Sequence, residues 1–126
     1  MRGLTLWLGL ALATPALAAT TQWAGFYTCA QGATALKLTL IDDDPTRVTA
    51  VFAFGPTPGN PDLPRGSYTL RGTRRGAQVE LTPDAWLERP EGYEMVGLNG
   101  GMAGTRFEGR ILFDGCGPFA LERQGG

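Results

Sequence analysis

Apolar and polar residues alternate along most of the chain after residue 20, which is the period of β-strands that bury one face. In segment 34–41, three leucines share one face and polar residues occupy the other. The same alternation predicts seven more strands, at 23–29, 47–54, 67–71, 77–82, 93–98, 105–113 and 119–123. The inward-facing residues that we expect in the core are Leu36, Leu38, Leu40, Phe52, Phe107 and Ile111.

Segments rich in glycine, proline, asparagine and aspartate separate these strands. Two of them are long: 55–65 contains four prolines, and 83–92 shows no clear alternation, so we expect both to be irregular loops. A tight turn is expected at 99–101, where the sequence reads Asn-Gly-Gly. About eight short strands without helical periodicity are typical of an all-β fold of antiparallel strands, either a small barrel or a two-sheet sandwich.

The two cysteines lie near the two ends of this strand pattern. Cys29 ends the first predicted strand and Cys116 precedes the last one. An even number of cysteines in an exported chain indicates a disulfide. Because a disulfide holds its two Cα atoms within about 7 Å of each other, the first and last strands must be neighbours or face each other. This constraint favours the barrel, whose closure also removes exposed strand edges.

The first eighteen residues have the features of a cleaved signal peptide. Arg2 gives a positive start, 4–13 is an apolar run, and Ala16-Leu17-Ala18 is a small-residue cleavage motif. The run is shorter than the roughly 20 apolar residues that a membrane-spanning helix needs, and no later segment is long enough. We therefore expect cleavage after Ala18, a single mature domain at 19–126 without a transmembrane segment, and a bacterial protein of the periplasm or the secreted fraction.

Composition excludes several kinds of chemistry. Eleven basic and twelve acidic residues give no basic excess for a nucleic-acid partner. The absence of histidine removes the commonest general base and metal ligand, and Ser67 and Lys37 are the only serine and the only lysine. The consecutive aspartates at 42–44 are interpreted as a solvated turn, with a weak calcium site as the alternative. We expect no metal, no cofactor and no enzymatic activity.

Three glutamates cluster in the sequence near two aromatic residues. Glu88, Glu91 and Glu94 lie beside Trp86 and Tyr93. Two carboxylates can catalyse glycoside hydrolysis, so a carboxylate-dependent enzyme that acts on glycans is one hypothesis. A chain of this length hardly provides the long cleft that such enzymes use. A binding site without catalysis is therefore the preferred interpretation.

The predicted binding patch combines the two long irregular segments, since binding residues favour loops held by a rigid scaffold. Aromatic rings supply contact area, guanidinium groups supply forked hydrogen-bond donors, and a carboxylate supplies an acceptor. The residues assigned to these roles are Trp86, Tyr93, Arg65, Arg89 and Glu88. The alternative for Trp86 is a packing role at one open end of the barrel.

Four segments give the chain a family resemblance. They are W-A-G-F-Y-T-C-A-Q-G at 23–32, P-R-G-S-Y at 64–68, G-Y-E-M-V-G-L at 92–98 and the closing Cys116. With them the chain resembles a family of small exported bacterial domains, found alone or attached to other secreted proteins, including caspase-like ones. The resemblance implies an exported, disulfide-linked β-domain and implies no activity.

A looser similarity links the chain to periplasmic inhibitors of C-type lysozyme. Those proteins are small disulfide-linked barrels with an early Tyr-x-Cys-x-x-Gly followed by an alternating strand, as at 27–32 and 36–40 here. Their serine- and glycine-rich inhibitory loop is absent, and so is their usual lysine in a Trp-associated loop.

The function that we expect is therefore a monomeric, non-enzymatic binding domain of the bacterial cell envelope. Its partner would be an envelope protein or glycan that the sequence does not identify. The alternatives are a lysozyme-inhibitor-like protein and the glycan-acting enzyme.

Overall fold

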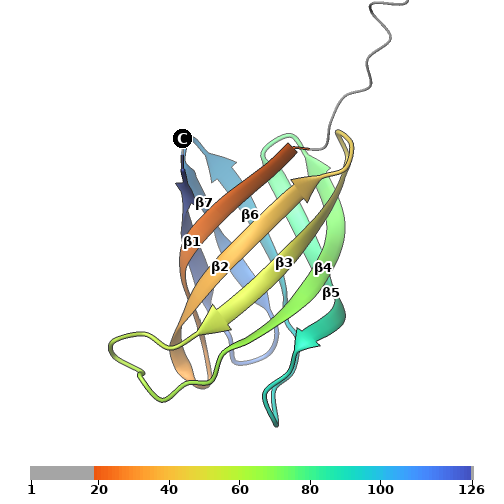
Figure 1. Cartoon of the computed structure of the whole chain (residues 1–126). Coiled ribbons are helices and arrows are strands. Elements are labelled where there is room, and N and C mark those ends of the chain that lie inside the picture. The colour runs from red at the N-terminus through yellow and green to blue at the C-terminus, as the bar shows by residue number, and fades with distance from the viewer. Residues whose placement is uncertain (1–18, 126) are drawn as a thin grey trace, which may run out of the picture.

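Eight antiparallel strands form one closed barrel in the computed structural model (Figure 1). The structure describes residues 19–125, and the predicted signal peptide lies outside these residues. The strands are β1 (Ala19–Cys29), β2 (Gly32–Asp42), β3 (Arg47–Gly55), β4 (Gly66–Arg75), β5 (Gln78–Glu88), β6 (Gly97–Ala103), β7 (Arg106–Leu112) and β8 (Pro118–Gln124). Within 19–125, no helix is long and apolar enough to cross a membrane.

Each strand pairs with the next one in the chain, and β8 pairs with β1, which confirms the barrel over the sandwich. The β1–β8 register runs from Gln22 opposite Gln124 to Tyr27 opposite Phe119. At this seam a side chain at Gly25 would place its Cβ 2.0 Å from the carbonyl oxygen of Ala120, so only glycine permits the approach. The disulfide between Cys29 and Cys116, 87 positions apart, fastens one end of the seam as predicted.

Alternate side chains point into the barrel and form a continuous hydrophobic core. All six residues predicted for the core are buried, and Leu38, Leu40, Phe52 and Phe107 have no exposed surface. The neighbouring outward residue Lys37 is exposed. The two-residue alternation in the sequence therefore identifies correctly which face of these strands points into the barrel and which faces solvent.

The prediction that 83–92 is an irregular loop is wrong over its first half, because β5 continues to Glu88. A register shift breaks the alternation there: Leu70 pairs with Pro83, whereas Tyr68 pairs with Trp86, so β5 carries extra residues. Proline is tolerated at position 83 because β5 pairs with β6 only as far as Leu81.

The prediction of a turn at 99–101 is also wrong. The prediction of a strand at 93–98 is wrong over its first four residues, because β6 begins at Gly97. Residues 93–96 belong to the loop 89–96, and β6 runs through Asn-Gly-Gly to Ala103. Gly100 reflects close approach between strands, since a Cβ there would lie 2.5 Å from the carbonyl oxygen of Glu108 in β7. The turn falls instead at Gly104, which has a φ of 61°.

The aspartate-rich turn between β2 and β3 is held by its own carboxylates. Asp44 accepts hydrogen bonds from the backbone amides of Thr46 at 2.8 Å and Arg47 at 2.9 Å, and Arg47 Nε donates to it at 2.7 Å. Asp42 forms an ion pair with Arg74 of β4 at 2.8 Å. Within 19–125, no three His, Cys, Asp or Glu residues gather closely enough to hold a metal ion.

Replacing Leu38 with alanine removes a fully buried side chain from the middle of the barrel. We predict that Leu38→Ala lowers the free energy of unfolding by about 2–5 kcal/mol, as for other buried leucines. Chemical denaturation measures this change, with Lys37→Ala as the matched control on the outward face. A loss below about 0.5 kcal/mol, the size expected for a surface substitution, would mean that the strand faces the opposite way.

Replacing Asp44 with alanine should make the barrel less stable in a pH-dependent way. The amide of Thr46, followed by the side chain of Arg47, lowers the pKa of Asp44 to about 2. A carboxyl group with a depressed pKa stabilises the fold above its unfolded pKa, near 4, and this contribution is lost as the pH falls towards 2. We predict a lower melting temperature for Asp44→Ala at pH 6, and a smaller difference from the natural protein at pH 2.5. Asp43→Ala is the control, and an equal difference at both pH values would contradict the prediction.

Candidate functional site

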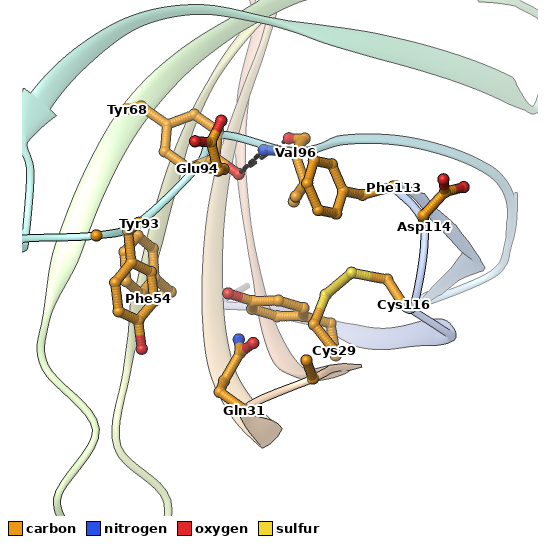
Figure 2. Close-up of a pocket in the computed structure, with 13 residues that line it drawn as sticks. Cys29, Gln31, Phe54, Tyr68, Tyr93, Glu94, Val96, Phe113, Asp114 and Cys116 are labelled. Carbon is orange, nitrogen blue, oxygen red and sulfur yellow. Dashed lines mark hydrogen bonds between the residues drawn. A yellow bond between two sulfur atoms is a disulfide. The ribbon is translucent and has the colours of Figure 1, made fainter.

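A cavity of about 310 Å³ opens at the end of the barrel where β1 ends (Figure 2). In Figure 1 this end of the barrel is the one opposite to the C-terminus. Its walls come from the ends of β1 and β3, the start of β4, the β1–β2 turn, the loop 89–96 and the β7–β8 turn at 113–117. The site therefore draws on segments from one end of the chain to the other. It exists only because the strands close into a barrel.

Aromatic side chains line the cavity on opposite sides. Tyr27, Phe54 and Tyr68 line it and are buried. Tyr93 stacks on Phe54, with ring centroids 5.2 Å apart and an angle of 12° between the planes. Figure 2 shows this stacked pair on one side of the cavity and Phe113 on the other. Phe113 is 48% exposed, so its ring remains accessible from solvent.

The hydroxyl group of Tyr68 anchors the loop 89–96 to the barrel. It donates to the carbonyl oxygen of Val96 and accepts from the backbone amide of the same residue, both at 2.9 Å (Figure 2). Burial raises the pKa of Tyr68 above its usual value, so the hydroxyl keeps its proton at neutral pH. The two bonds satisfy a buried phenol and fix the point at which the loop enters β6.

The disulfide forms part of the cavity wall and positions the β7–β8 turn. Both cysteines line the cavity. The amide of Gly117 donates to the carbonyl oxygen of Thr28 at 2.8 Å. The amide of Cys116 donates to the carbonyl oxygen of Phe113 at 3.1 Å. Covalent and hydrogen bonds together therefore hold the turn that carries Phe113 over the cavity.

The polar groups of the site are concentrated at its rim. Glu94 and Asp114 are exposed, and neither forms an ion pair with a basic residue of the described chain. Gln31 contributes an amide from the β1–β2 turn. Deeper in the cavity, burial and then the nearby Tyr93 raise the pKa of Tyr27, so its phenol stays neutral. Negative charge is thus confined to the two rim carboxylates.

Of the five residues predicted for binding, Tyr93 alone lines the cavity. Trp86 lies next to it, half-buried, with its ring edge-to-face against Tyr68 at 5.1 Å and Phe54 at 6.4 Å. The guanidinium group of Arg89 covers the Trp86 ring at 5.5 Å from its centroid. Trp86 and Arg89 therefore form a pair beside the cavity.

The other two predicted residues lie elsewhere. Glu88 is exposed at the end of β5, opposite Ser67. Arg65 borders a separate shallow groove on the outer face of β1, β2 and β3, which also contains Lys37 and the exposed Phe26. The structure does not bring Arg65 and Glu88 into one site with Tyr93.

Sequence reasoning missed most of the residues that line the cavity. Tyr27 and Tyr68 follow the inward alternation of their strands, which marks them as core residues and gives no sign of a cavity. Phe113 and Asp114 precede Cys116, and their proximity to the predicted disulfide was the one available signal. Glu94 was recognised only as a member of the glutamate cluster.

Comparison with protein-family models, with curated proteins and with solved structures gives no match for this chain. The site is therefore interpreted from its own geometry.

Substitutions of Trp86 and Arg89 separate packing from ligand contact. Because Trp86 is half-buried against two core rings, we predict that Trp86→Ala lowers the free energy of unfolding by about 2 kcal/mol, less than for a fully buried tryptophan. Arg89→Ala should cost at most about 1 kcal/mol, the value of an exposed cation–π contact. Thermal and chemical denaturation measure both changes, with the exposed Leu87→Ala as the control. Unchanged stability in Trp86→Ala would indicate a contact residue with no packing role.

Proposed function

We propose that this chain is an exported, monomeric, non-enzymatic binding domain of the bacterial cell envelope, and that it holds its ligand in the end cavity. The observation that carries the proposal is the cavity itself. It combines aromatic walls with a few polar groups at the rim, which is the usual composition of a small-ligand site. The rigid barrel and its disulfide hold these walls in place before a ligand arrives, which reduces the entropy lost on binding.

The placement of the reactive side chains supports binding over catalysis. Among Glu88, Glu91 and Glu94, only Glu94 lines the cavity. Lys37 and Ser67 flank Ala53 in one row across β2, β3 and β4, so the strand β3 separates the only lysine from the only serine. A nucleophile and its base need to lie within hydrogen-bond reach of each other.

Export is supported by the disulfide and by the predicted leader. A disulfide such as Cys29–Cys116, which links the end of the first strand to the turn before the last one, forms and persists in oxidising compartments such as the periplasm or the extracellular space. The predicted leader would direct the chain there. The mass of the mature protein after expression of the full chain in a bacterium tests this part, and the expected value is that of residues 19–126.

Inhibition of C-type lysozyme is the second candidate function. The observation that favours it is the position of the Tyr-x-Cys-x-x-Gly segment, whose Tyr27, Cys29 and Gln31 all line the cavity. A protein partner would then insert a side chain at this end of the barrel. A lysozyme activity assay with added protein distinguishes this candidate from other binding functions.

Backbone amide NMR of the labelled protein tests the main proposal. Envelope extract, separated into soluble proteins and peptidoglycan fragments, is added fraction by fraction, and the fragments are analysed by mass for cleavage. We predict shift changes confined to 29–31, 89–96 and 113–117, with no cleavage. Tyr93→Ala should weaken binding about tenfold or more, whereas Gln78→Ala at the opposite end should not.

Three results would contradict the proposal. They are cleavage of the fragments, shift changes confined to the opposite end of the barrel, and the absence of any shift change with all fractions.

A further inference from the structure

We infer that the end cavity selects a compact organic cation, namely an ammonium or guanidinium group on a short apolar stem. This inference rests on the proposed function, because it takes the cavity to be the ligand site and assigns the chemical class of the ligand. Three features of the cavity support it: the aromatic surfaces, the sign of the charges around them, and the size.

Aromatic rings surround the space that a ligand would occupy. The Phe54–Tyr93 stack and Phe113 stand on opposite sides (Figure 2), and the buried Tyr27 and Tyr68 also line the cavity. The face of an aromatic ring attracts a cation through its quadrupole, and rings that enclose a cation recognise ammonium groups in this way. The same rings favour contact with an apolar stem. An uncharged polar ligand would gain much less from these walls.

The charges at the rim are all negative. Glu94 enters from the loop 89–96 and Asp114 from the β7–β8 turn, so carboxylates flank the cavity from two different segments. Figure 2 shows Glu94 near Tyr68 and Val96, and Asp114 beside Phe113. Because both carboxylates are exposed and lack basic partners in the described chain, they remain available to a ligand.

Basic residues do not contribute to the cavity. None of the lysine or arginine side chains between residues 19 and 125 lines it. The two arginines of the neighbouring loops are placed elsewhere, Arg89 over the Trp86 ring and Arg65 at the outer groove. An anionic ligand would therefore meet repulsion at the rim and find no partner inside.

The size of the cavity limits the ligand. A volume of about 310 Å³ is at the lower end of the range for small-molecule sites. It suits a single group of the size of an arginine or lysine side chain. The cation can be a free small molecule or a side chain of a polypeptide, and both present the same chemistry to the cavity.

Titration of the full mature protein with defined probes tests this inference. The probes are acetyl-arginine amide and acetyl-lysine amide as cations, acetyl-norleucine amide as the neutral analogue, and acetyl-glutamate amide as the anion. We predict that the cations shift the backbone amides of 29–31, 89–96 and 113–117 and bind at least about tenfold more tightly than the other two. A pentapeptide with a central arginine tests whether the natural cation is a side chain of a polypeptide. If the pentapeptide binds more tightly than acetyl-arginine amide, the ligand is a polypeptide; if it binds equally or more weakly, the ligand is a free cation.

Two matched substitutions test whether the rim carboxylates cause the preference for cations. Glu94→Gln and Asp114→Asn should each weaken cation binding about fivefold and leave the affinity for the neutral probe unchanged. Glu91→Gln, an exposed glutamate of the same loop that does not line the cavity, should have no effect. Cation binding should also weaken as salt is raised from 50 to 500 mM, because the rim carboxylates are exposed.

The inference fails if the neutral or anionic probe binds in the cavity as tightly as the cations, or if no cation shifts the cavity amides. In either case the proposed function is judged separately by the envelope fractions. A fraction that shifts the cavity amides preserves that function with a ligand of another class, whereas the absence of any such fraction rejects both.

Discussion

Pairing of the first strand with the last strand is the interaction on which the rest of this structure depends. The β1–β8 seam converts a meander of eight strands into a closed barrel, and the Cys29–Cys116 bond fastens one end of the seam. Across so long a loop, chain entropy predicts a stabilisation of about 4–5 kcal/mol from the disulfide, a large share of the stability of a small domain. The seam also removes the exposed edges of β1 and β8, which would otherwise be free to pair with other chains.

Closure also creates the candidate site. The cavity is lined by residues from β1, β3 and β4, from the β1–β2 turn, and from two connecting segments in the C-terminal half of the chain. The hydrogen bonds between Tyr68 and Val96 hold the loop 89–96 in place, and the disulfide holds the β7–β8 turn. Buried neutral phenols together with exposed carboxylates at the rim give the cavity its chemical character.

Sequence reasoning succeeded where one physical rule acted alone. Alternation identified the inward faces of β2 and β3, and the cysteine pair predicted that the first and last strands are neighbours. It failed where tertiary contacts override local signals. The register shift opposite Tyr68 extends β5 past Pro83, and the close approach of the β7 backbone explains Gly100, which suggested a turn. The cavity could not be predicted, because the sequence pattern that marks Tyr27 and Tyr68 as core residues is the same whether or not a space is left between them.

Amide hydrogen exchange along the β1–β8 seam of the oxidised protein tests closure most directly. A closed barrel predicts that amides of β1 and β8 that point across the seam, between Gln22 and Tyr27 and between Phe119 and Gln124, exchange as slowly as those between β2 and β3 at matching depth. Rapid exchange at the seam, with slow exchange retained between β2 and β3, would show an open sheet and contradict both the barrel and the cavity that depends on it.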